Sequence, residues 1–236
     1  MEKRELLYEG KAKKLFATDD PGLVIQYFKD DATAFDGTKK ATIASKGVIN
    51  NACSEIFFRL LEGHGVRTHF VERLDEREML CRRLDIVPVE MIVRNVMAGS
   101  LARRLGRPEG DRLAAPIVEY CYKSDALHDP LINRWHVTVL GFATGAEIDT
   151  MTAMALRVNE ILTPFLAARK LLLVDMKLEF GRFQGDILLG DEICPDTCRF
   201  WDADTGRKLD KDRFRHDLGD VAEAYHEVHR RLTSPA

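Results

Sequence analysis

The sequence lacks a surplus of positive charge and a long hydrophobic run. Its 35 lysine and arginine residues face 38 aspartate and glutamate residues, for a net charge of −3 over 236 residues. This balance argues against a nucleic-acid partner, because proteins that coat nucleic acid need a basic excess. No apolar run approaches the ~20 residues that cross a bilayer, and the charged start Met1–Glu5 has no apolar segment behind it. We therefore expect a cytoplasmic protein with no membrane partner.

Paired cysteines and the common site motifs are also missing. The five cysteines, at 53, 81, 121, 194 and 198, are odd in number and widely spread, which favours reduced thiols over a disulfide framework. Cys194 and Cys198 have three residues between them and no neighbouring histidines, which disfavours a zinc site. The sequence contains no G-x-S-x-G, H-E-x-x-H, C-x-x-C or G-x-G-x-x-G.

What is present is a mixture of strands and helices without a regular βαβ rhythm, which favours an α+β fold. Strands are predicted at 6–16 and 23–28, around the turn 19–22, then at 68–73, 78–83 and 86–95. Helices are predicted at 46–61, from Ser100 as N-cap, at 146–168 and from 211 onward, with Pro164 kinking or breaking the third. We place a domain boundary near 83–88, which divides the chain into 1–85 and 86–236.

The segment 171–180 carries charges in an otherwise apolar strand. Alternate side chains of a strand share a face. This predicts one face with Leu172, Val174, Met176, Leu178 and Phe180, and an opposite face with Asp175, Lys177 and Glu179. Such a charged row must be solvated, mutually paired or bound to a ligand, because an uncompensated buried charge costs several kcal/mol.

A second strand, 186–189, follows the expected loop 181–185 and leads to Asp191. A bend at Gly190 could bring the Asp191 carboxylate back toward Glu179. Two converging carboxylates suit Mg²⁺, which prefers oxygen ligands and retains phosphates among them. The alternative is an exposed hairpin whose polar face meets water, and the spacing alone leaves both interpretations open.

Two further segments have the chemistry of phosphate sites. Lys11 and Lys13 are expected to share a strand face beside Gly10, although the P-loop pattern is missing. Arg94 precedes a turn and a helix start at Ser100, and helix N-termini bind phosphate. A solvated lysine face and a plain helix cap are the simpler interpretations. Arg213 and Arg215 would oppose a helix dipole, and a bound anion would relieve that conflict.

Ordered blocks from Tyr8 to about Leu232 resemble the SAICAR synthetase family of purine biosynthesis. The blocks are Tyr8–Lys13, Ala34–Gly37, Lys46–Asn51, Val87–Glu90, Val93–Asn95, Ala98–Leu101, Asp125–Pro130, Val174–Gly181, Leu189–Glu192 and Asp210–Arg215. The segments 40–45 and 133–138 match little of the family pattern.

The resemblance implies a two-lobed α+β fold related to ATP-grasp enzymes, with an N-terminal antiparallel β lobe and a larger α+β lobe. It implies a ligase that joins L-aspartate to 5-amino-1-(5-phospho-D-ribosyl)imidazole-4-carboxylate (carboxyaminoimidazole ribotide). ATP, with Mg²⁺, would convert the carboxylate into an acyl phosphate, because a free carboxylate repels an attacking amine. The resemblance also implies a homo-oligomer.

The resemblance further implies site residues by position. ATP would contact Lys11, Lys13 and Lys177, with adenine near Ile86. Glu179 and Asp191 would bind Mg²⁺, and Asp36, Asp175 and Lys177 would be catalytic. The ribotide would be held by a larger set, namely Arg94, Ser100, Lys123, Asp129, Arg199 and Arg215. A small-molecule kinase using the same cleft, or a nucleotide-sensing or RNA-binding module, is the alternative function.

Overall fold

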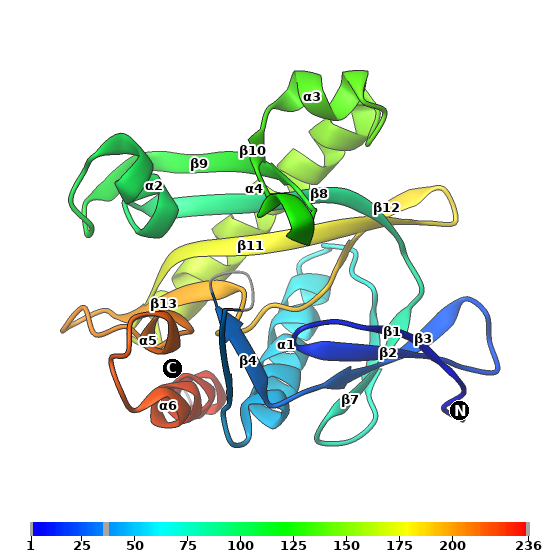
Figure 1. The fold of residues 1–236 in the computed structure, drawn as a ribbon, viewed down its shortest axis with the longest axis horizontal. Coiled ribbons are helices and arrows are strands. Elements are labelled where there is room, and N and C mark those ends of the chain that lie inside the picture. The colour runs from blue at the N-terminus through cyan, green and yellow to red at the C-terminus, as the bar shows by residue number, and fades with distance from the viewer. Residues whose placement is uncertain (1, 35–37, 235–236) are drawn as a thin grey trace.

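The computed structural model describes residues 2–34 and 38–234 and consists of two antiparallel sheets with helices packed around them (Figure 1). The fold is α+β, as predicted. Within the described ranges, no helix combines the length and the apolar character needed to cross a membrane.

The first sheet is N-terminal and has the strand order β1-β2-β3-β7-β6, with every neighbouring pair antiparallel. Its strands are β1 Leu6–Glu9, β2 Lys13–Ala17, β3 Leu23–Phe28, β6 Phe70–Arg73 and β7 Glu78–Arg82. The predicted turn after β2 forms because Asp20 Oδ1 accepts a hydrogen bond from the Gly22 N–H (2.8 Å). A separate hairpin, β4 Asp31–Ala34 and β5 Lys39–Thr42, extends from this sheet.

The second sheet has the order β10-β9-β8-β11-β12, with β13 also paired to β11. Its strands are β8 Asp85–Val96, β9 Arg112–Tyr122, β10 Leu131–Ile132, β11 Leu171–Phe183, β12 Asp186–Gly190 and β13 Cys198–Asp202. β11 lies at its centre and pairs with β8 along one edge, and with β12 and β13 along the other. Residues of β11 can therefore face side chains from three other strands.

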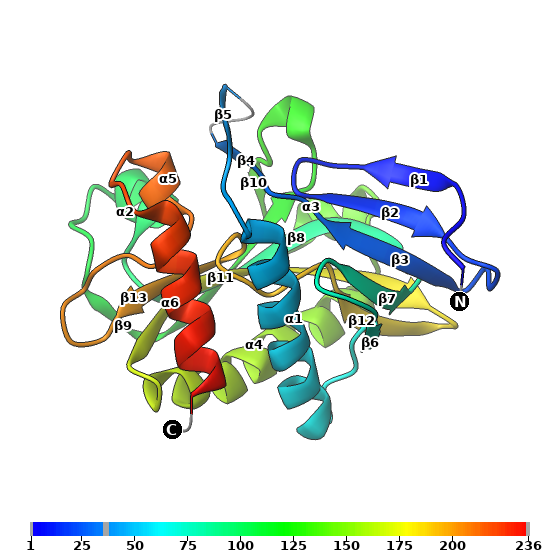
Figure 2. The same cartoon turned by 90° about the horizontal axis from the view of Figure 1, so that it is seen from below.

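Three longer helices cover the sheets, α1 Lys46–Gly63, α4 Gly145–Ala167 and α6 Val221–Thr233 (Figure 2). The short ones are α2 Gly99–Leu105, α3 Arg134–Val139, α5 Asp212–Arg215 and the 3₁₀ turn Asp125–Leu127. A Thr144–Glu147 capping box begins α4. The helix continues through Pro164 to Ala167, so the predicted break is wrong.

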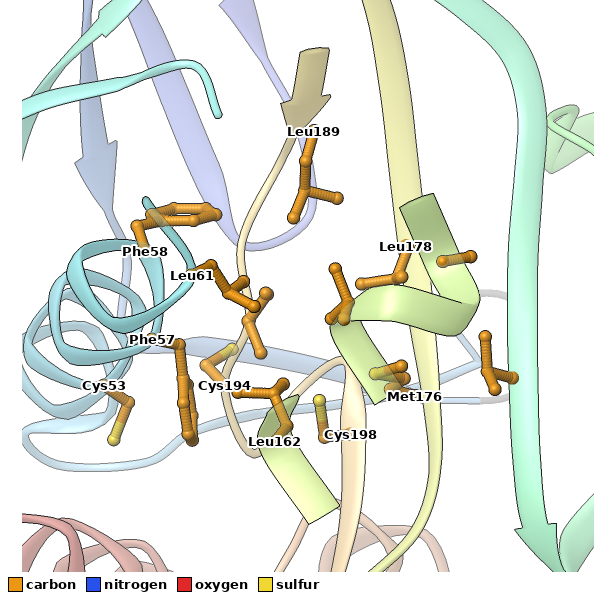
Figure 3. Packing of buried hydrophobic residues seen from close by; sticks show 14 of the residues in the cluster. Cys53, Phe57, Phe58, Leu61, Leu162, Met176, Leu178, Leu189, Cys194 and Cys198 are labelled. Carbon is orange, nitrogen blue, oxygen red and sulfur yellow. The ribbon is translucent and has the colours of Figure 1, made fainter. Parts of the chain in front are cut away.

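The main hydrophobic core lies between α1, α4 and the second sheet (Figure 3). Phe57 of α1 packs against Phe165 of α4 and Phe200 of β13, with ring centroids 6.3 and 6.1 Å apart. The same cluster includes Phe28 from the first sheet and Val89 from the second. The boundary at residue 85 coincides with the start of β8, but the core is continuous across it, and the division into two domains stays a prediction.

The alternation predicted for β11 holds only for its second half. A bulge in the pairing with β13 between Leu173 and Asp175 reverses the phase. Leu173 therefore joins the main core with Met176, while Val174 packs with Trp201 in a separate cluster. Placing Leu172 and Val174 on the face of Met176 was wrong, because the bulge depends on a partner strand that the local sequence does not reveal.

The C-terminal helix predicted from residue 211 is divided into α5 and α6. Asp217, Gly219 and Asp220 have positive φ angles, which a helix cannot contain. Leu218, which lies between the two helices, is exposed. Arg213 donates to the carbonyls of Leu218 and Gly219 (both 2.8 Å), so the conflict with the helix dipole is resolved without an anion.

His69, just before β6, is a buried titratable group at the core edge, 5% exposed and packed edge-on against Phe58. Burial, with a smaller contribution from the charge of Lys13, lowers the pKa of His69 to about 4. The unfolded chain binds this proton near pH 6.5 and the folded chain does not. The contribution of His69 to the free energy of unfolding should therefore be fully present above pH 6.5, and about 3 kcal/mol of it should be lost as the pH drops to 4.

We expect His69→Gln to flatten this pH dependence between pH 6.5 and 4.5, measured as the urea-unfolding free energy at several pH values. The exposed His64→Gln is the control and should keep the slope of the parent protein. Identical slopes for His69→Gln and the parent would contradict this assignment.

Candidate active site

One large cavity, of about 1360 Å³, separates the N-terminal strands and the β4–β5 hairpin from β8, β11 and the segment 191–199. It brings together almost all of the predicted site residues. Those in its wall are Lys11, Lys13, Arg94, Ser100, Lys123, Asp129, Asp175, Lys177, Glu179, Asp191, Arg199 and Arg215. Ile86, predicted near adenine, is not among the lining residues and is 38% exposed on β8. Asp36 lies outside the described residues.

At one end of the cavity is a lysine–carboxylate cluster, formed by Lys13, Lys123 and Lys177 with Glu90, Glu179, Asp191 and Glu192. Lys177 Nζ lies 2.6 Å from Glu179 Oε1, 3.0 Å from Glu90 Oε1 and 3.6 Å from Asp191 Oδ2. Lys13 pairs with Asp191, and Lys123 Nζ donates to Glu179 (2.8 Å). The exposed-hairpin interpretation of 171–192 is therefore wrong, since this row is paired inside a cavity.

Asp191 reaches this cluster because of the β11–β12 register. The turn is the two-residue Gln184–Gly185, with φ of 51° and 89°, rather than the predicted loop 181–185. Strand pairing therefore continues to Glu179 opposite Gly190. Asp191 follows directly, and the chain bends at Asp191 itself, whose φ is 61°, rather than at Gly190.

The cluster keeps its charges through mutual pairing. Burial opposes ionisation of Asp191, but the ammonium groups of Lys13 and Lys177 outweigh it and hold its pKa well below the usual range. Burial also opposes protonation of Lys177, yet Glu179, Asp191 and Glu90 raise its pKa well above normal. Near neutral pH Asp191 and Lys177 are therefore ions, whereas burial raises the pKa of Glu90 and of Glu192.

The donor set fits a Mg²⁺ ion that shares its coordination with a ligand. Among the described residues there is no group of three or more His, Cys, Asp or Glu arranged to hold a metal. Glu179 and Asp191 offer two carboxylates, and Glu192 Oε2 is buried without a hydrogen-bond partner. Mg²⁺ typically binds one or two carboxylates and completes its shell with phosphates and water. The residues present thus suit a phosphate-bound ion.

At the other end is an arginine cluster, formed by Arg94, Arg199 and Arg215 with Asp175 and Asp212. Asp175 Oδ2 accepts from Arg94 Nη1 (2.9 Å) and Arg199 Nη1 (2.8 Å). Asp212 accepts from Arg199 Nε (2.8 Å) and Arg215 Nη1 (2.6 Å). Arg94 Nε also donates to Glu119 (2.6 Å), so three guanidinium groups are balanced by three carboxylates. A phosphate bound here would share the N–H donors of these arginines.

The helix start beside this cluster differs from the prediction. Ser100 is not the N-cap of α2; Ala98 is, and no side chain caps that end. Ser100 lies in the first turn, where its Oγ accepts from Arg94 Nη2 (2.8 Å). A Cβ at Gly99 would lie 2.6 Å from the Arg199 guanidinium, so this glycine lets Arg199 approach the helix start.

Two predicted residues, Lys11 and Asp129, lie in the loops that border the cavity. Lys11 is in the bend between β1 and β2, so it does not share a strand face with Lys13; its Nζ donates to Asp125 Oδ1 (2.8 Å) across the cavity. Asp129 Oδ1 accepts from the Ser124 N–H (2.8 Å), which holds that loop in shape.

Sequence reasoning missed Glu90, Glu192, Asp196, Lys211 and Asp212, all of which lie in or beside the cavity. Glu90 had a usable signal, because it lies on the same strand face as Arg94, and Ile92 between them also lines the cavity. The cysteine prediction is confirmed, since all five cysteines are free and buried.

Comparisons with known proteins agree along nearly the whole chain. The family model described as SAICAR synthetase matches residues 6–232. The chain is 62% identical over 232 residues to phosphoribosylaminoimidazole-succinocarboxamide synthase of Chlorobium chlorochromatii, covering 98% of this chain and 99% of that protein. The crystal structure of the Ehrlichia chaffeensis synthase superposes with a TM-score of 0.96 at 42% identity, covering 98% and 100%.

A solved SAICAR synthetase in complex with ADP has a TM-score of 0.94 and 54% identity, covering 98% of this chain and 100% of that one. These matches confirm the resemblance seen in the sequence and the fold it implied. The chain belongs to the SAICAR synthetase family.

Proposed function

We propose that this chain is the ATP-dependent ligase of de novo purine biosynthesis that joins L-aspartate to carboxyaminoimidazole ribotide, giving SAICAR, ADP and phosphate. The observation that carries the proposal is the single cavity that has the lysine–carboxylate cluster at one end and the arginine cluster at the other. Both clusters include residues of β11, with Asp175 and Lys177 two positions apart. Family membership and the ADP complex of a relative support the use of ATP.

The lysine–carboxylate cluster is suited to the nucleotide phosphates. Lys11, Lys13 and Lys177 bind them, and Glu179 with Asp191 holds Mg²⁺, which supplies charge neutralisation at the transferring phosphoryl group. These residues position the phosphate against the ribotide carboxylate so that an acyl phosphate forms. Catalysis then consists mainly of positioning and charge stabilisation.

The arginine cluster is suited to the ribotide. Arg94, Arg199 and Arg215, with Ser100, bind its phosphate, while Lys123 and Asp129 lie nearer the lysine–carboxylate cluster. Asp175 holds two of these arginines in place and is in this sense part of the catalytic site. Adenine lies near Ile86, where β8 enters the second sheet and the two proposed domains, 1–85 and 86–236, meet. Asp36 remains a catalytic candidate.

The test is ADP release from purified protein given ATP, Mg²⁺, carboxyaminoimidazole ribotide and aspartate. Aspartate-dependent ADP formation with SAICAR as product is the expected result. ADP release without aspartate, together with a stable phosphorylated product, would establish the kinase alternative instead. Ligand binding without any turnover would point to a sensing module.

We also propose that the chain works as a cytoplasmic homo-oligomer. Large apolar side chains are exposed on and beside α3, namely Trp135 (74%), Val139 (79%), Leu140 (61%) and Leu131 (48%). A contiguous exposed apolar patch marks an interaction surface, and we propose a second copy of the chain as its partner.

Light scattering should show a dimer or trimer for the parent protein and a monomer for Trp135→Glu with Val139→Glu. A monomeric parent would refute this proposal.

A further inference from the structure

Lys211 is a cavity-lining residue to which no role has yet been given. It occupies the N-cap position of α5, where its backbone N–H donates to the Pro195 carbonyl (3.1 Å). The Arg215 N–H donates back to the Lys211 carbonyl (3.0 Å), so the two side chains start one helical turn apart. The position of Lys211 is therefore fixed by the same segment that carries the arginine cluster.

The ammonium group of Lys211 has no partner among the described residues, either in a hydrogen bond or in an ion pair. Every other cation of the two clusters has at least one carboxylate partner. These cations are Lys13, Lys123, Lys177, Arg94, Arg199 and Arg215. Lys40 on β5 also lacks such a partner, but it is exposed to water and needs none. Lys211 is only partly exposed, and burial lowers its pKa despite the opposing effect of Asp196.

Asp196, the carboxylate that acts most strongly on Lys211, is already occupied. Asp196 Oδ2 accepts from Lys46 Nζ (2.6 Å), and Asp196 Oδ1 accepts from the Tyr225 hydroxyl (2.6 Å). Both donors are fully buried, so the pairing is enclosed by α1 and α6. Asp196 therefore stays with Lys46, and the Lys211 ammonium remains available to a ligand.

Lys211 lines the same cavity as both clusters. Its charge acts on Glu192, which belongs to the lysine–carboxylate cluster, and on Arg215, which belongs to the arginine cluster. In the proposed function, nucleotide phosphates occupy one end of the cavity and the ribotide phosphate the other. The carboxyl group that reacts must then lie between them, and the amine of the third substrate must reach it there.

We infer that Lys211 binds a carboxylate of L-aspartate and thereby holds the amine of that substrate beside the activated carboxyl carbon. The inference rests on the proposed function. An unpaired, half-buried cation is unfavourable for folding, and a dicarboxylate substrate supplies the missing anion. Lys211 is thus assigned to substrate binding, in contact with the third substrate only.

The test compares steady-state kinetics of the full chain with Lys211→Met and Lys211→Arg, varying one substrate at a time. For Lys211→Met we expect the KM for aspartate to rise about 10- to 100-fold, as for loss of one charge-assisted hydrogen bond. The KM values for ATP and ribotide should stay within about twofold. Lys211→Arg should restore part of the aspartate affinity because it retains the charge.

Lys208→Met is the matched control. Lys208 lies three residues earlier, pairs with Glu109 (2.9 Å) and does not line the cavity. Its kinetic constants should equal those of the parent protein. Succinate, a dicarboxylate without the amine, should compete with aspartate in the parent and inhibit Lys211→Met at least tenfold more weakly.

The thermal melting temperature separates binding from structure, since removing an unpaired cation should leave it unchanged or raise it. An unchanged KM for aspartate in an active Lys211→Met enzyme would overturn the inference, and so would equal increases in all three KM values with a lower melting temperature. Should Lys211→Met fail to fold, the structural role is established and the inference is wrong. Absence of aspartate-dependent ADP in the parent protein would instead refute the proposed function.

Discussion

Asp191→Asn should lower kcat by about 10³-fold or more, an effect expected for removing a charge that stabilises phosphoryl transfer. The substitution keeps the shape of the side chain and removes the carboxylate that pairs with Lys13 and lies 3.6 Å from Lys177. It therefore deprives the site of one of two proposed Mg²⁺ ligands and of the group that orients both lysines. Glu179→Gln should behave in the same way, because Glu179 pairs with Lys177 and Lys123.

The measurement is ADP formation at saturating ATP, ribotide and aspartate, over a range of Mg²⁺ concentrations. Asp186→Asn is the matched control: Asp186 begins β12, the strand that leads to Asp191, but its side chain is solvent-exposed, and its ion-pair partner among the described residues is Arg67 (2.9 Å). That variant should retain kcat within about twofold, and all three variants should unfold cooperatively. A normal kcat in Asp191→Asn would show that Asp191 has no part in the reaction.

The charged face of β11 could be predicted because it depends on local alternation. Asp175, Lys177 and Glu179 face the cavity in the structure, as their spacing indicated. The first half of the strand could not be predicted, because the bulge arises from pairing with β13, which lies more than twenty residues away in sequence. A one-residue change of phase moves every following side chain to the other face.

Turn geometry explains most of the other differences. Asp191 was placed too far from Glu179 because a five-residue loop was expected where a two-residue turn forms at Gln184–Gly185. In the C-terminal segment, the helical spacing of apolar residues led to the prediction of one continuous helix. Gly219 has a positive φ and separates α5 from α6. Gln-Gly and Leu-Gly-Asp were visible turn signals that the periodicity obscured.

The pairing state of each cation, by contrast, cannot be predicted from local sequence at all. Lys11, Lys13 and Lys211 are all lysines close to acidic residues in sequence, yet they have different partners in the structure. Lys13 pairs with Asp191, almost 180 residues away, and Lys11 reaches Asp125. Lys211 has no partner within residues 2–34 and 38–234. Such partners are properties of the assembled cavity.

The second prediction with a large effect concerns the arginine cluster. Arg94 and Arg215 were both predicted as ribotide ligands, but we expect substitution of Arg94 to affect stability and substitution of Arg215 to affect binding. Arg94 is 2% exposed and donates to Glu119 (2.6 Å), Asp175 (2.9 Å) and Ser100 (2.8 Å). Its removal leaves two buried carboxylates short of a partner. We expect Arg94→Met to lower the unfolding free energy by about 3 kcal/mol or more, as for a broken buried ion pair.

Arg215 is partly exposed, and its one carboxylate partner in the described part of the chain, Asp212, keeps Arg199 (2.8 Å) after the substitution. Arg215→Met should therefore cost no more than about 1 kcal/mol, the range of an accessible ion pair. Its effect should appear in binding, with a rise of about 10- to 100-fold in the KM for ribotide and little change in the KM for ATP.

Urea unfolding of both variants, with initial-rate kinetics on Arg215→Met, separates the two roles. Because Arg94 supports the fold as well as the site, a loss of activity in Arg94→Met alone does not identify a ligand, whereas Arg215→Met reports on the ribotide directly. Equal increases in the KM for ribotide and for ATP in Arg215→Met would show that the ribotide phosphate does not bind at the arginine cluster. Equal stability losses in the two variants would mean that Arg215, too, is held by the fold rather than free to meet a ligand.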